Sequence, residues 1–408
     1  MRTLLIALLL TPTPQAKPKP GAAEATDWNQ FRGPKRDGIS PDTGLLKEWA
    51  ASGPPIAWKA KGVGTGYSSV CVSGARVYTM GEIAGDYCLI ALNVADGKMV
   101  WTARIAKVQD VPYPGTRTTP ATDGAIVVAL SPHGDLVAVQ AATGKEMWRQ
   151  KFDGPRPGWG FSESPLIDGG MVIATPGGGS GTVAAYNKAN GQLVWRSGEL
   201  KDAAAYASVV PVEISKIPLY LVFTAESVAG LVAKTGRVAF KAERKGQTAV
   251  IPTPVYKDGM LFVSSGYGVG HNGFQVAFAG NAFKVQQVYS GKEMQNHHGG
   301  VIVVGDHVYG LSDNGGLKCI ELKTGKEIWA NGSVGKGAIA YADGHLYCRS
   351  ERGPIALVEA SPTAYKEKGR FTPPDCTAKD VWPHPVVSGG KFYVRDQDTL
   401  ICFDVKAK

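Results

Sequence analysis

One motif recurs along most of this chain and constrains its fold more than any other feature of the sequence. Each copy has a short apolar run, a turn such as Thr-Gly-Lys or Asp-Gly-Lys, and an aromatic residue shortly after the turn. The clearest copies end at Trp101, Trp148, Trp195, Phe240 and Trp329. The first three intervals are 47, 47 and 45 residues, and the 89 residues from Phe240 to Trp329 make two periods, with a degenerate copy near Tyr289. Such periodicity predicts one structural unit built many times.

A second marker, a tight turn between two apolar runs rich in β-branched residues, recurs at the same period. Its copies are Ser73-Gly74, Asp123-Gly124, Asp168-Gly169, Asp258-Gly259, Gly305-Asp306, Asp343-Gly344 and Ser388-Gly389. An eighth copy, at Ser215-Lys216, lacks the glycine. Asp-Gly and Gly-Asp pairs between alternating strands favour two-residue hairpins. The markers therefore divide the chain into eight units of about 44 residues.

Each unit is predicted to contain four strands, and four strands in about 44 residues is typical of a β-propeller blade. The last unit ends after its third strand, and Pro55–Lys59 carries a terminal tryptophan with no unit before it. We therefore predict an all-β, eight-bladed propeller in which the N-terminal strand completes the C-terminal blade and leaves no open edge. The propeller is expected to span residues 55–408, with residues 26–54 as an N-terminal extension packed on it.

The aromatic residue that ends each unit is expected to wedge one blade against the next. The residues given this structural role are Trp58, Trp101, Trp148, Trp195, Phe240 and Trp329. The 52 glycines, about twice the usual share, fit a chain with many tight turns.

The N-terminus has one positive charge, a seven-residue apolar run and then a Pro- and Lys-rich stretch. Residues 1–25 are therefore predicted to be a signal peptide followed by a disordered leader, which places the protein in the periplasm or outside the cell. Seven apolar residues are too few to span a bilayer, so no membrane span is expected.

Charge and cysteine patterns exclude several classes of site. The net charge of +9 is spread without any run of five like charges, which argues against a nucleic-acid-binding tail. The six cysteines form no Cys-x-x-Cys pair, so neither a zinc site nor a redox motif is predicted. Gly268–Gly273 matches the dinucleotide-binding glycine pattern, but a strand-like segment follows where that motif requires a helix.

The residues just before the first strand of each unit should form the funnel at one end of the central channel. Large polar or aromatic residues at these positions are candidates for ligand binding: Tyr67, Arg117, Glu163, His297, His298, Lys336, Trp382 and His384. The alternative is that the hydroxyls and histidines of this region satisfy backbone groups and meet only water. Catalytic residues cannot be assigned from the sequence.

Two further expectations concern the acidic and imidazole groups of this set. Desolvation in a narrow channel should raise the pKa of Glu163, which with a histidine could form an acid/base pair. Because consecutive residues of an extended strand point in opposite directions, only one of His297 and His298 should reach the channel. A metal ion would then need Glu163 and His384 as well, and we predict no metal site.

The A-x-D/N-x-x-T-G-K-x-x-W pattern resembles the repeat of pyrroloquinoline-quinone (PQQ) enzymes and of their non-catalytic relatives. Those relatives include the periplasmic propeller lipoprotein that assists outer-membrane protein assembly. The block from Trp28 to Gly38 also resembles the leader of secreted bacterial PQQ-like propellers. The resemblance implies PQQ and calcium as cofactors, but this chain lacks the vicinal cysteine pair of the alcohol-oxidising enzymes and a convincing Glu, Asn and Asp set for calcium.

The sequence therefore favours an exported, monomeric binding or scaffold protein with a protein partner or small ligand at the funnel. The alternative is a PQQ-dependent oxidoreductase acting on alcohols or sugars. A third class, sugar binding or hydrolysis at the funnel, also stays open, and the sequence does not decide whether the chain is an enzyme.

Overall fold

A computed structural model of the chain describes residues 27–377 and 379–408. The predicted signal peptide and the stretch expected to be disordered after it, residues 1–25, lie outside the described residues. All regular structure in the described ranges is β-strand, so the predicted all-β fold is confirmed. No helix in these ranges is long and apolar enough to cross a membrane.

Five four-stranded sheets are antiparallel meanders whose strands follow one another in chain order. They are β2–β5 (Cys71–Ser73, Arg76–Ile83, Asp86–Asn93, Met99–Lys107), β6–β9 (Ala121–Thr122, Ile126–Leu130, Asp135–Gln140, Glu146–Lys151), β10–β13 (Leu166–Asp168, Met171–Ala174, Ala184–Asn187, Leu193–Arg196), β14–β17 (Val210–Ile214, Ile217–Phe223, Ser227–Val232, Val238–Glu243) and β18–β21 (Val255–Lys257, Met260–Ser265, Gly270–Ala279, Ala282–Gly291).

Eight further strands make two meanders of the same kind, joined through a single parallel pairing of Gly299 with Ala338. Their strands are β22–β25 (Asn296–Val304, His307–Ser312, Gly316–Glu321, Glu327–Asn331) and β26–β29 (Gly337–Ala342, His345–Ser350, Ile355–Glu359, Glu367–Phe371). The last sheet combines β30–β32 (Val386–Ser388, Lys391–Asp396, Thr399–Asp404) with β1 (Ile56–Lys61).

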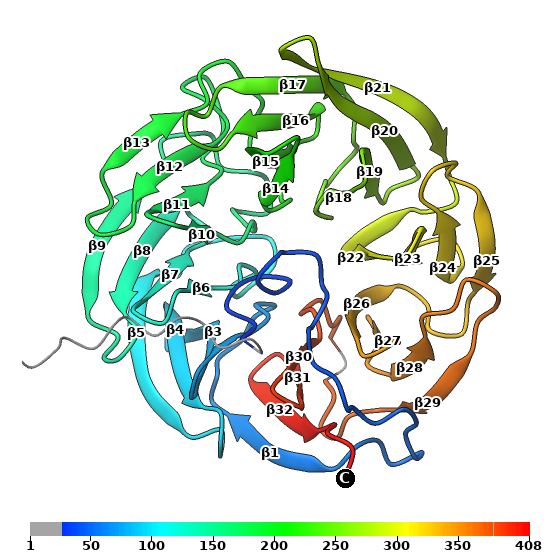
Figure 1. Cartoon of the computed structure of the whole chain (residues 1–408). Coiled ribbons are helices and arrows are strands. Elements are labelled where there is room, and N and C mark those ends of the chain that lie inside the picture. Colours follow the sequence, from blue (N-terminus) through cyan, green and yellow to red (C-terminus); the bar gives the residue numbers. More distant parts are fainter. Residues whose placement is uncertain (1–26, 378) are drawn as a thin grey trace, which may run out of the picture.

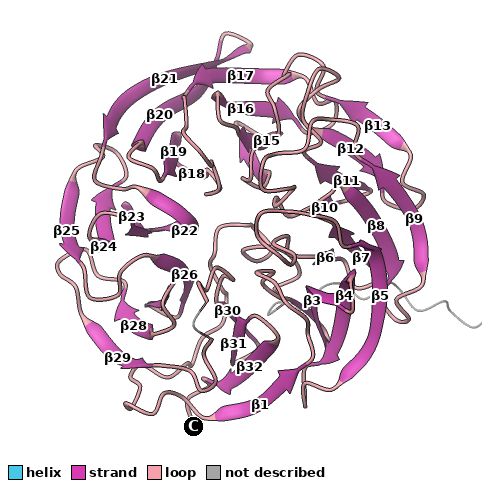
Figure 2. Cartoon of the chain, turned by 180° about the vertical axis from the view of Figure 1, so that it is seen from behind, coloured by secondary structure: helices cyan, strands magenta, loops and turns pink. Residues whose placement is uncertain are grey.

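The meanders are arranged around a central axis, with the first strand of each innermost and the fourth at the circumference (Figure 1). The 32 strands of the described residues are the number that eight blades of four require. β1 pairs antiparallel with β32, so the two ends of the chain share one sheet. Figure 2 shows the same ring from behind, with loops at its centre.

The predicted hairpin turns separate the first and second strands of every meander. At Ser215-Lys216, the copy without glycine, both residues adopt positive φ values of 53° and 64°. The turn geometry is thus kept even though the side chains do not favour it. The glycine pattern at Gly268–Gly273 runs into strand β20, so the expectation that it opens no helix is confirmed.

Hydrophobic clusters fill the spaces between neighbouring meanders. One cluster joins β7–β9 to β11 and β12, and the next joins β10–β13 to β15 and β16. The largest cluster contains residues of β30–β32 and reaches both β26–β29 on one side and β2–β4 on the other. A separate hydrophobic cluster or a part of one thus lies at each interface between neighbouring sheets, which pack face to face.

The periodic aromatic residues lie at these interfaces, and five of them cover a glycine of the following unit. The indoles of Trp58, Trp101, Trp148 and Trp195 cover Gly97, Gly144, Gly191 and Gly236, and the Tyr289 ring covers Gly325. A Cβ atom at any of these glycines would lie less than 3.0 Å from the ring.

Hydrogen bonds fix most of these rings in place. The indole N–H of Trp58, Trp101, Trp148 and Trp329 donates to a carbonyl of the following unit at 2.7–3.1 Å. Phe240, which has no such donor, packs in a cluster with residues of β19 and β20. In five of the units, the glycine turn and the aromatic residue of the preceding unit thus form one contact.

The segment from Asp27 to Gly53, here called the leader, crosses the centre of the ring (dark blue in Figure 1). It makes isolated bridges to two sheets and to the C-terminal segment: Trp28 with Val72, Ile39 with Tyr341 and Leu45 with Lys406. Arg32 donates to two carbonyls of β22, and Arg36 donates to carbonyls just before β10 and β14. Both guanidinium groups are almost completely buried, so the leader ties distant parts of the ring together.

Candidate functional site

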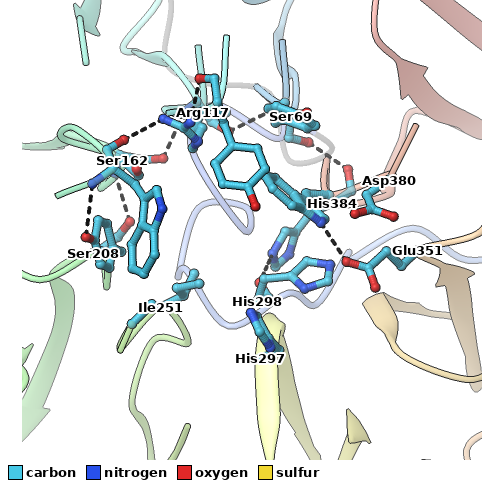
Figure 3. A pocket seen from close by; sticks show the side chains of 18 of the residues that line it. Ser69, Arg117, Ser162, Ser208, Ile251, His297, His298, Glu351, Asp380 and His384 are labelled. Carbon is cyan, nitrogen blue, oxygen red and sulfur yellow. Dashed lines mark hydrogen bonds between the residues drawn. The ribbon is translucent and has the colours of Figure 1, made fainter. Parts of the chain in front are cut away.

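A cavity of about 330 Å³ lies at the centre of the ring, on the side where the loops before the first strands converge. Every meander contributes to its wall, and Phe31 of the leader contributes as well. Seven of the eight predicted funnel residues line it: Tyr67, Arg117, His297, His298, Lys336, Trp382 and His384. Figure 3 shows several of these side chains turned toward one another across the cavity.

The repeat explains why these residues meet. In six meanders the residue four positions before the first strand lines the cavity: Tyr67, Arg117, Ser162, Tyr206, Ile251 and Trp382. The same backbone geometry, repeated around the ring, aims each of these side chains at the axis. Tyr206 and Ile251, which precede Ser208 and Thr253 by two positions, were not predicted.

Glu163, the eighth predicted residue, does not line the cavity. It lies one position later than the cavity-facing residues, and its side chain turns into its own meander, where Oε1 accepts a hydrogen bond from the Thr175 amide at 2.6 Å. Ser68 and Thr118 occupy equivalent positions and also bond to the second strand of their own meanders. The expected placement of Glu163 in the funnel is therefore wrong. Because side chains alternate along an extended chain, the Glu163 side chain points into its own meander and away from the cavity.

Burial nevertheless raises the pKa of Glu163 to about 7, with the Thr175 amide and the nearby Arg36 guanidinium opposing the shift. The side chain is fully buried and its Oε2 has no hydrogen-bond partner among the described residues. The predicted raised pKa is thus present, but no histidine bonds to this carboxyl group in the described part of the chain, and the expected acid/base pair is not formed.

Both His297 and His298 line the cavity, contrary to the expectation that only one would. The ladder between β22 and β23 is irregular between Asn296 and Val301, so neighbouring residues there do not alternate strictly. His297 Nδ1 lies 3.1 Å from a carboxylate oxygen of Asp313.

His298 and His384 are buried and uncharged. Burial lowers the pKa of His298 well below its usual value and the pKa of His384 to about 3. The Nε2 of His384 bonds to the His298 carbonyl at 2.9 Å, whereas neither ring nitrogen of His298 has a partner among the described residues. His298 therefore presents an unsatisfied donor and an unsatisfied acceptor at the cavity wall.

The hydroxyl groups of the wall are engaged with the backbone. Thr119, Ser164 and Ser208 each accept a hydrogen bond from a backbone N–H of the preceding meander, at 2.9–3.2 Å. Ser69 in turn donates its hydroxyl to the carbonyl of His384. These residues form a belt around the channel. Their hydroxyls satisfy backbone groups, as the alternative interpretation of the sequence proposed.

Aromatic rings cover much of the remaining wall and occur in pairs. The pairs are Tyr67 with Trp382 (centroids 4.3 Å apart), Tyr267 with His297 (4.5 Å) and Trp159 with Tyr206 (5.8 Å). Their interplanar angles are between 31° and 50°. Trp159 and Tyr113 lie in long connecting loops and Tyr267 in the short turn between β19 and β20, where the repeat gives no signal that they would reach the cavity.

Five charged side chains line the cavity, and four of them are paired. Lys336 lies 3.1 Å from Glu351, which also accepts the indole N–H of Trp382 at 2.7 Å. Arg352 pairs with Asp380 at 2.5 Å.

The fifth charged residue is Arg117, which has no carboxylate partner among the described residues. It donates to the carbonyls of Trp159 and Tyr113 at 2.7 and 2.6 Å, and burial lowers its pKa. The residues lining the cavity thus carry one uncompensated positive charge.

The donor groups expected for a bound metal do not converge. In the ranges 27–377 and 379–408, no three His, Cys, Asp or Glu residues are grouped so that they could hold a metal ion. All six cysteines are free, and none of them lines the cavity. A calcium-dependent quinone site of the kind implied by the resemblance therefore lacks a fitting donor set for its metal.

Comparisons with known proteins agree with this architecture. Residues 39–156 and 89–331 match the family model described as "Outer membrane protein assembly factor BamB". A stretch of 127 residues is 28% identical to that factor from Yersinia pestis, covering 31% of this chain and 29% of the relative. A stretch of 120 residues is 32% identical to quinohemoprotein alcohol dehydrogenase ADH IIB of Pseudomonas putida, covering 26% of this chain and 17% of the relative. The chain thus matches less than a third of the length of either relative.

Solved structures of both kinds share the fold. BamB from Moraxella catarrhalis superposes with a TM-score of 0.57 at 15% identity, covering 80% of this chain and 95% of that one. Quinohemoprotein alcohol dehydrogenase from Comamonas testosteroni superposes with a TM-score of 0.67 at 13% identity, covering 95% and 82%. At these identities the likeness concerns the fold alone.

Proposed function

The chain belongs to the PQQ-repeat family described by the outer membrane protein assembly factor BamB, and from this premise we propose that it is a non-catalytic binding protein. Its ligand, a small molecule or a segment of a protein partner, would occupy the central cavity. The observation that carries this proposal is the chemistry of the cavity wall. Its hydroxyls are bonded to the backbone, four of its five charged groups are paired and its buried imidazoles are neutral, so the wall is suited to binding rather than reaction.

The size and position of the cavity support the same proposal. A volume of about 330 Å³ is at the lower end of the range for small-molecule sites. The aromatic rings supply contact area, and Arg117 and His298 supply polar groups that have capacity for a ligand. We propose that all eight meanders are blades, that β1 closes the ring with β30–β32, and that residues 26–54 are an extension of the propeller domain 55–408.

A variant that fills the cavity tests the binding proposal. Ser162 lines the cavity and its hydroxyl bonds only to the Gly160 carbonyl, so Ser162→Trp should occupy the space without removing a belt contact. The matched control is Thr102→Trp on the exposed outer strand β5. Both proteins would be purified from the native host, and the co-purifying small molecules and proteins would be identified by mass spectrometry. Molecules retained by the wild type and by Thr102→Trp but lost from Ser162→Trp support the proposal, and identical sets for all three contradict it.

A PQQ-dependent oxidoreductase is the second candidate, because two of the similar proteins are named as quinoprotein or quinohemoprotein alcohol dehydrogenases. Arg117 and the aromatic rings could contact a planar anion, but the carboxylates of Glu351 and Asp380 are already paired with cations. Incubation with PQQ and calcium, followed by dye reduction with an alcohol or a sugar, separates the two functions. We expect no dye reduction, and substrate-dependent reduction would establish the oxidoreductase instead.

We also propose that the protein is exported and acts as a monomer. The N-terminal charge and apolar run of residues 1–10 support export. N-terminal sequencing of the protein from its native host would show a start after the apolar run, whereas an intact Met1 would contradict export.

A further inference from the structure

We propose that the central cavity binds an acidic saccharide, with the sugar carboxylate at Arg117, the ring on the aromatic wall and the hydroxyls at His298. This inference rests on the proposed binding function and names the chemical class of its ligand. It is carried by the unpaired cation, the ring geometry and the unsatisfied imidazole.

The Arg117 guanidinium is a place for a carboxylate. Its two hydrogen bonds among the described residues go to backbone carbonyls, which leave its positive charge without a carboxylate partner in a partly buried position. A guanidinium has five N–H donors, so further donors are free to bond to an anion. Arginine binds carboxylates through two parallel hydrogen bonds, and this geometry is favourable where water is largely excluded. The other two cations of the wall are paired with carboxylates, so a bound anionic group would gain the most favourable electrostatic interaction at Arg117.

The aromatic wall fits a puckered ring better than a flat one. The ring pairs of the wall meet at 31°, 46° and 50° and contact one another, so they do not form a slot of two parallel faces for a planar aromatic ligand. A sugar has C–H groups on its ring faces that pack on tilted aromatic surfaces and hydroxyls at its edge that point between them. Trp382, which contacts both Tyr67 and Tyr113, is one of two tryptophans that offer such a surface.

The imidazole of His298 matches a hydroxyl group. The side chain is 7% exposed, lines the cavity and has no partner at either ring nitrogen among the described residues. A neutral imidazole has one donor and one acceptor, and a sugar hydroxyl can serve either of them. A buried polar group without a partner costs free energy, so a ligand that satisfies it gains affinity.

The cavity limits the length of the saccharide. A volume of about 330 Å³ accommodates one or two sugar rings. On the leader side the wall includes Phe31, whose ring packs edge to face on His384 at 4.9 Å. A long polymer could therefore enter only by its end.

Calorimetric titration of the full chain with D-glucuronate and with D-glucose tests this inference, since the two sugars differ at the carboxylate. We expect glucuronate to bind at least about tenfold more tightly than glucose. Arg117→Gln should weaken glucuronate binding by at least about tenfold and change glucose binding by less than about twofold. Arg117→Lys, which keeps the charge, should retain part of the glucuronate affinity. Arg104→Gln, on the exposed strand β5, is the matched control and should bind as the wild type does.

The outcomes separate this inference from the function on which it rests. Equal affinity for the two sugars, unchanged glucuronate binding in Arg117→Gln, or no binding of either sugar at about 10 mM would each overturn the saccharide inference. If sugars do not bind but Ser162→Trp still loses a co-purified molecule, the cavity binds a different class of ligand and the binding function stands. PQQ that binds to the wild type and is displaced by neither sugar would also overturn the inference.

Discussion

At the scale of single residues, Glu163 illustrates how strongly one position in an extended segment determines the role of a side chain. Its neighbour Ser162 faces the cavity, whereas Glu163 turns into its meander and lies close to Arg36 of the leader. The carboxyl group is fully buried with one unsatisfied oxygen, so the fold favours its protonated form.

This burial predicts a pH-dependent stability. The pKa of Glu163 rises from 4.5 to about 7 on folding, so the group favours the folded state below pH 4.5 and this contribution is lost as the pH rises through 7. Glu163→Gln should therefore gain about 2 kcal/mol of unfolding free energy relative to the wild type between about pH 5 and pH 8. Urea denaturation at the two pH values measures this gain.

The exposed Glu146→Gln, on strand β9, is the control and should show no such gain. An equal difference between Glu163→Gln and the wild type at both pH values would mean that the carboxyl group is not desolvated in the folded protein.

Among the cavity residues, the repeat made Tyr67, Arg117 and Trp382 predictable, because they precede their strands by the same number of residues. Trp159 and Phe31 were not predictable. Trp159 lies in a long loop, and Phe31 reaches the cavity because the leader crosses the ring, a contact between distant parts of the chain that no local pattern encodes.

At the scale of elements, the contact between an aromatic ring and the next unit's glycine turn holds neighbouring meanders together. Trp148 is 7% exposed, covers Gly191 and donates its indole N–H to the carbonyl of Lys188 at 2.8 Å. The sequence predicted this wedge role, and the structure adds its physical basis, a ring placed where only a glycine leaves room.

We expect Trp148→Ala to lower the free energy of unfolding by about 3 kcal/mol, because it opens a cavity between two meanders and removes a hydrogen bond. Met147→Ala, at the adjacent exposed position, should change the unfolding free energy by less than about 0.5 kcal/mol. Chemical denaturation of both variants is the measurement. Similar losses for the two would show that the wedge contact adds no stability.

The leader is the element whose role the sequence described least well. It was expected to pack on the propeller, but its two buried arginines reach carbonyls on different sides of the channel. The residue spacing in the leader does not indicate which carbonyl groups the two arginines bond to.

Arg36→Met should destabilise the protein by about 3 kcal/mol, since it leaves buried carbonyls without donors and removes the cation near Glu163. Hydrogen exchange in peptides of residues 27–53 should accelerate in this variant, while exchange in β23 and β24 should change little. The neighbouring exposed residue provides the control, Lys35→Met, which should behave as the wild type. Unchanged exchange in Arg36→Met would show that the leader is held by its other contacts.

At the scale of the whole molecule, the two ends of the chain meet in one sheet, and Arg395 reinforces this junction. Its guanidinium donates to the carbonyls of Ser68, Met80 and Gly64 in the first meander and to the Thr79 hydroxyl. The sequence predicted that the ends would pair, because one unit lacked a strand and a spare strand preceded the first unit. It did not indicate the buried arginine that crosses the junction.

We propose that the ring places a binding site in the cavity lined by Tyr67, Trp159 and Trp382. A crystal structure of the protein purified from its native host tests this claim most directly. We expect ordered non-protein density in the cavity, in contact with Arg117 and His298. A cavity that holds only water, together with a bound ligand or partner elsewhere on the surface, would contradict it.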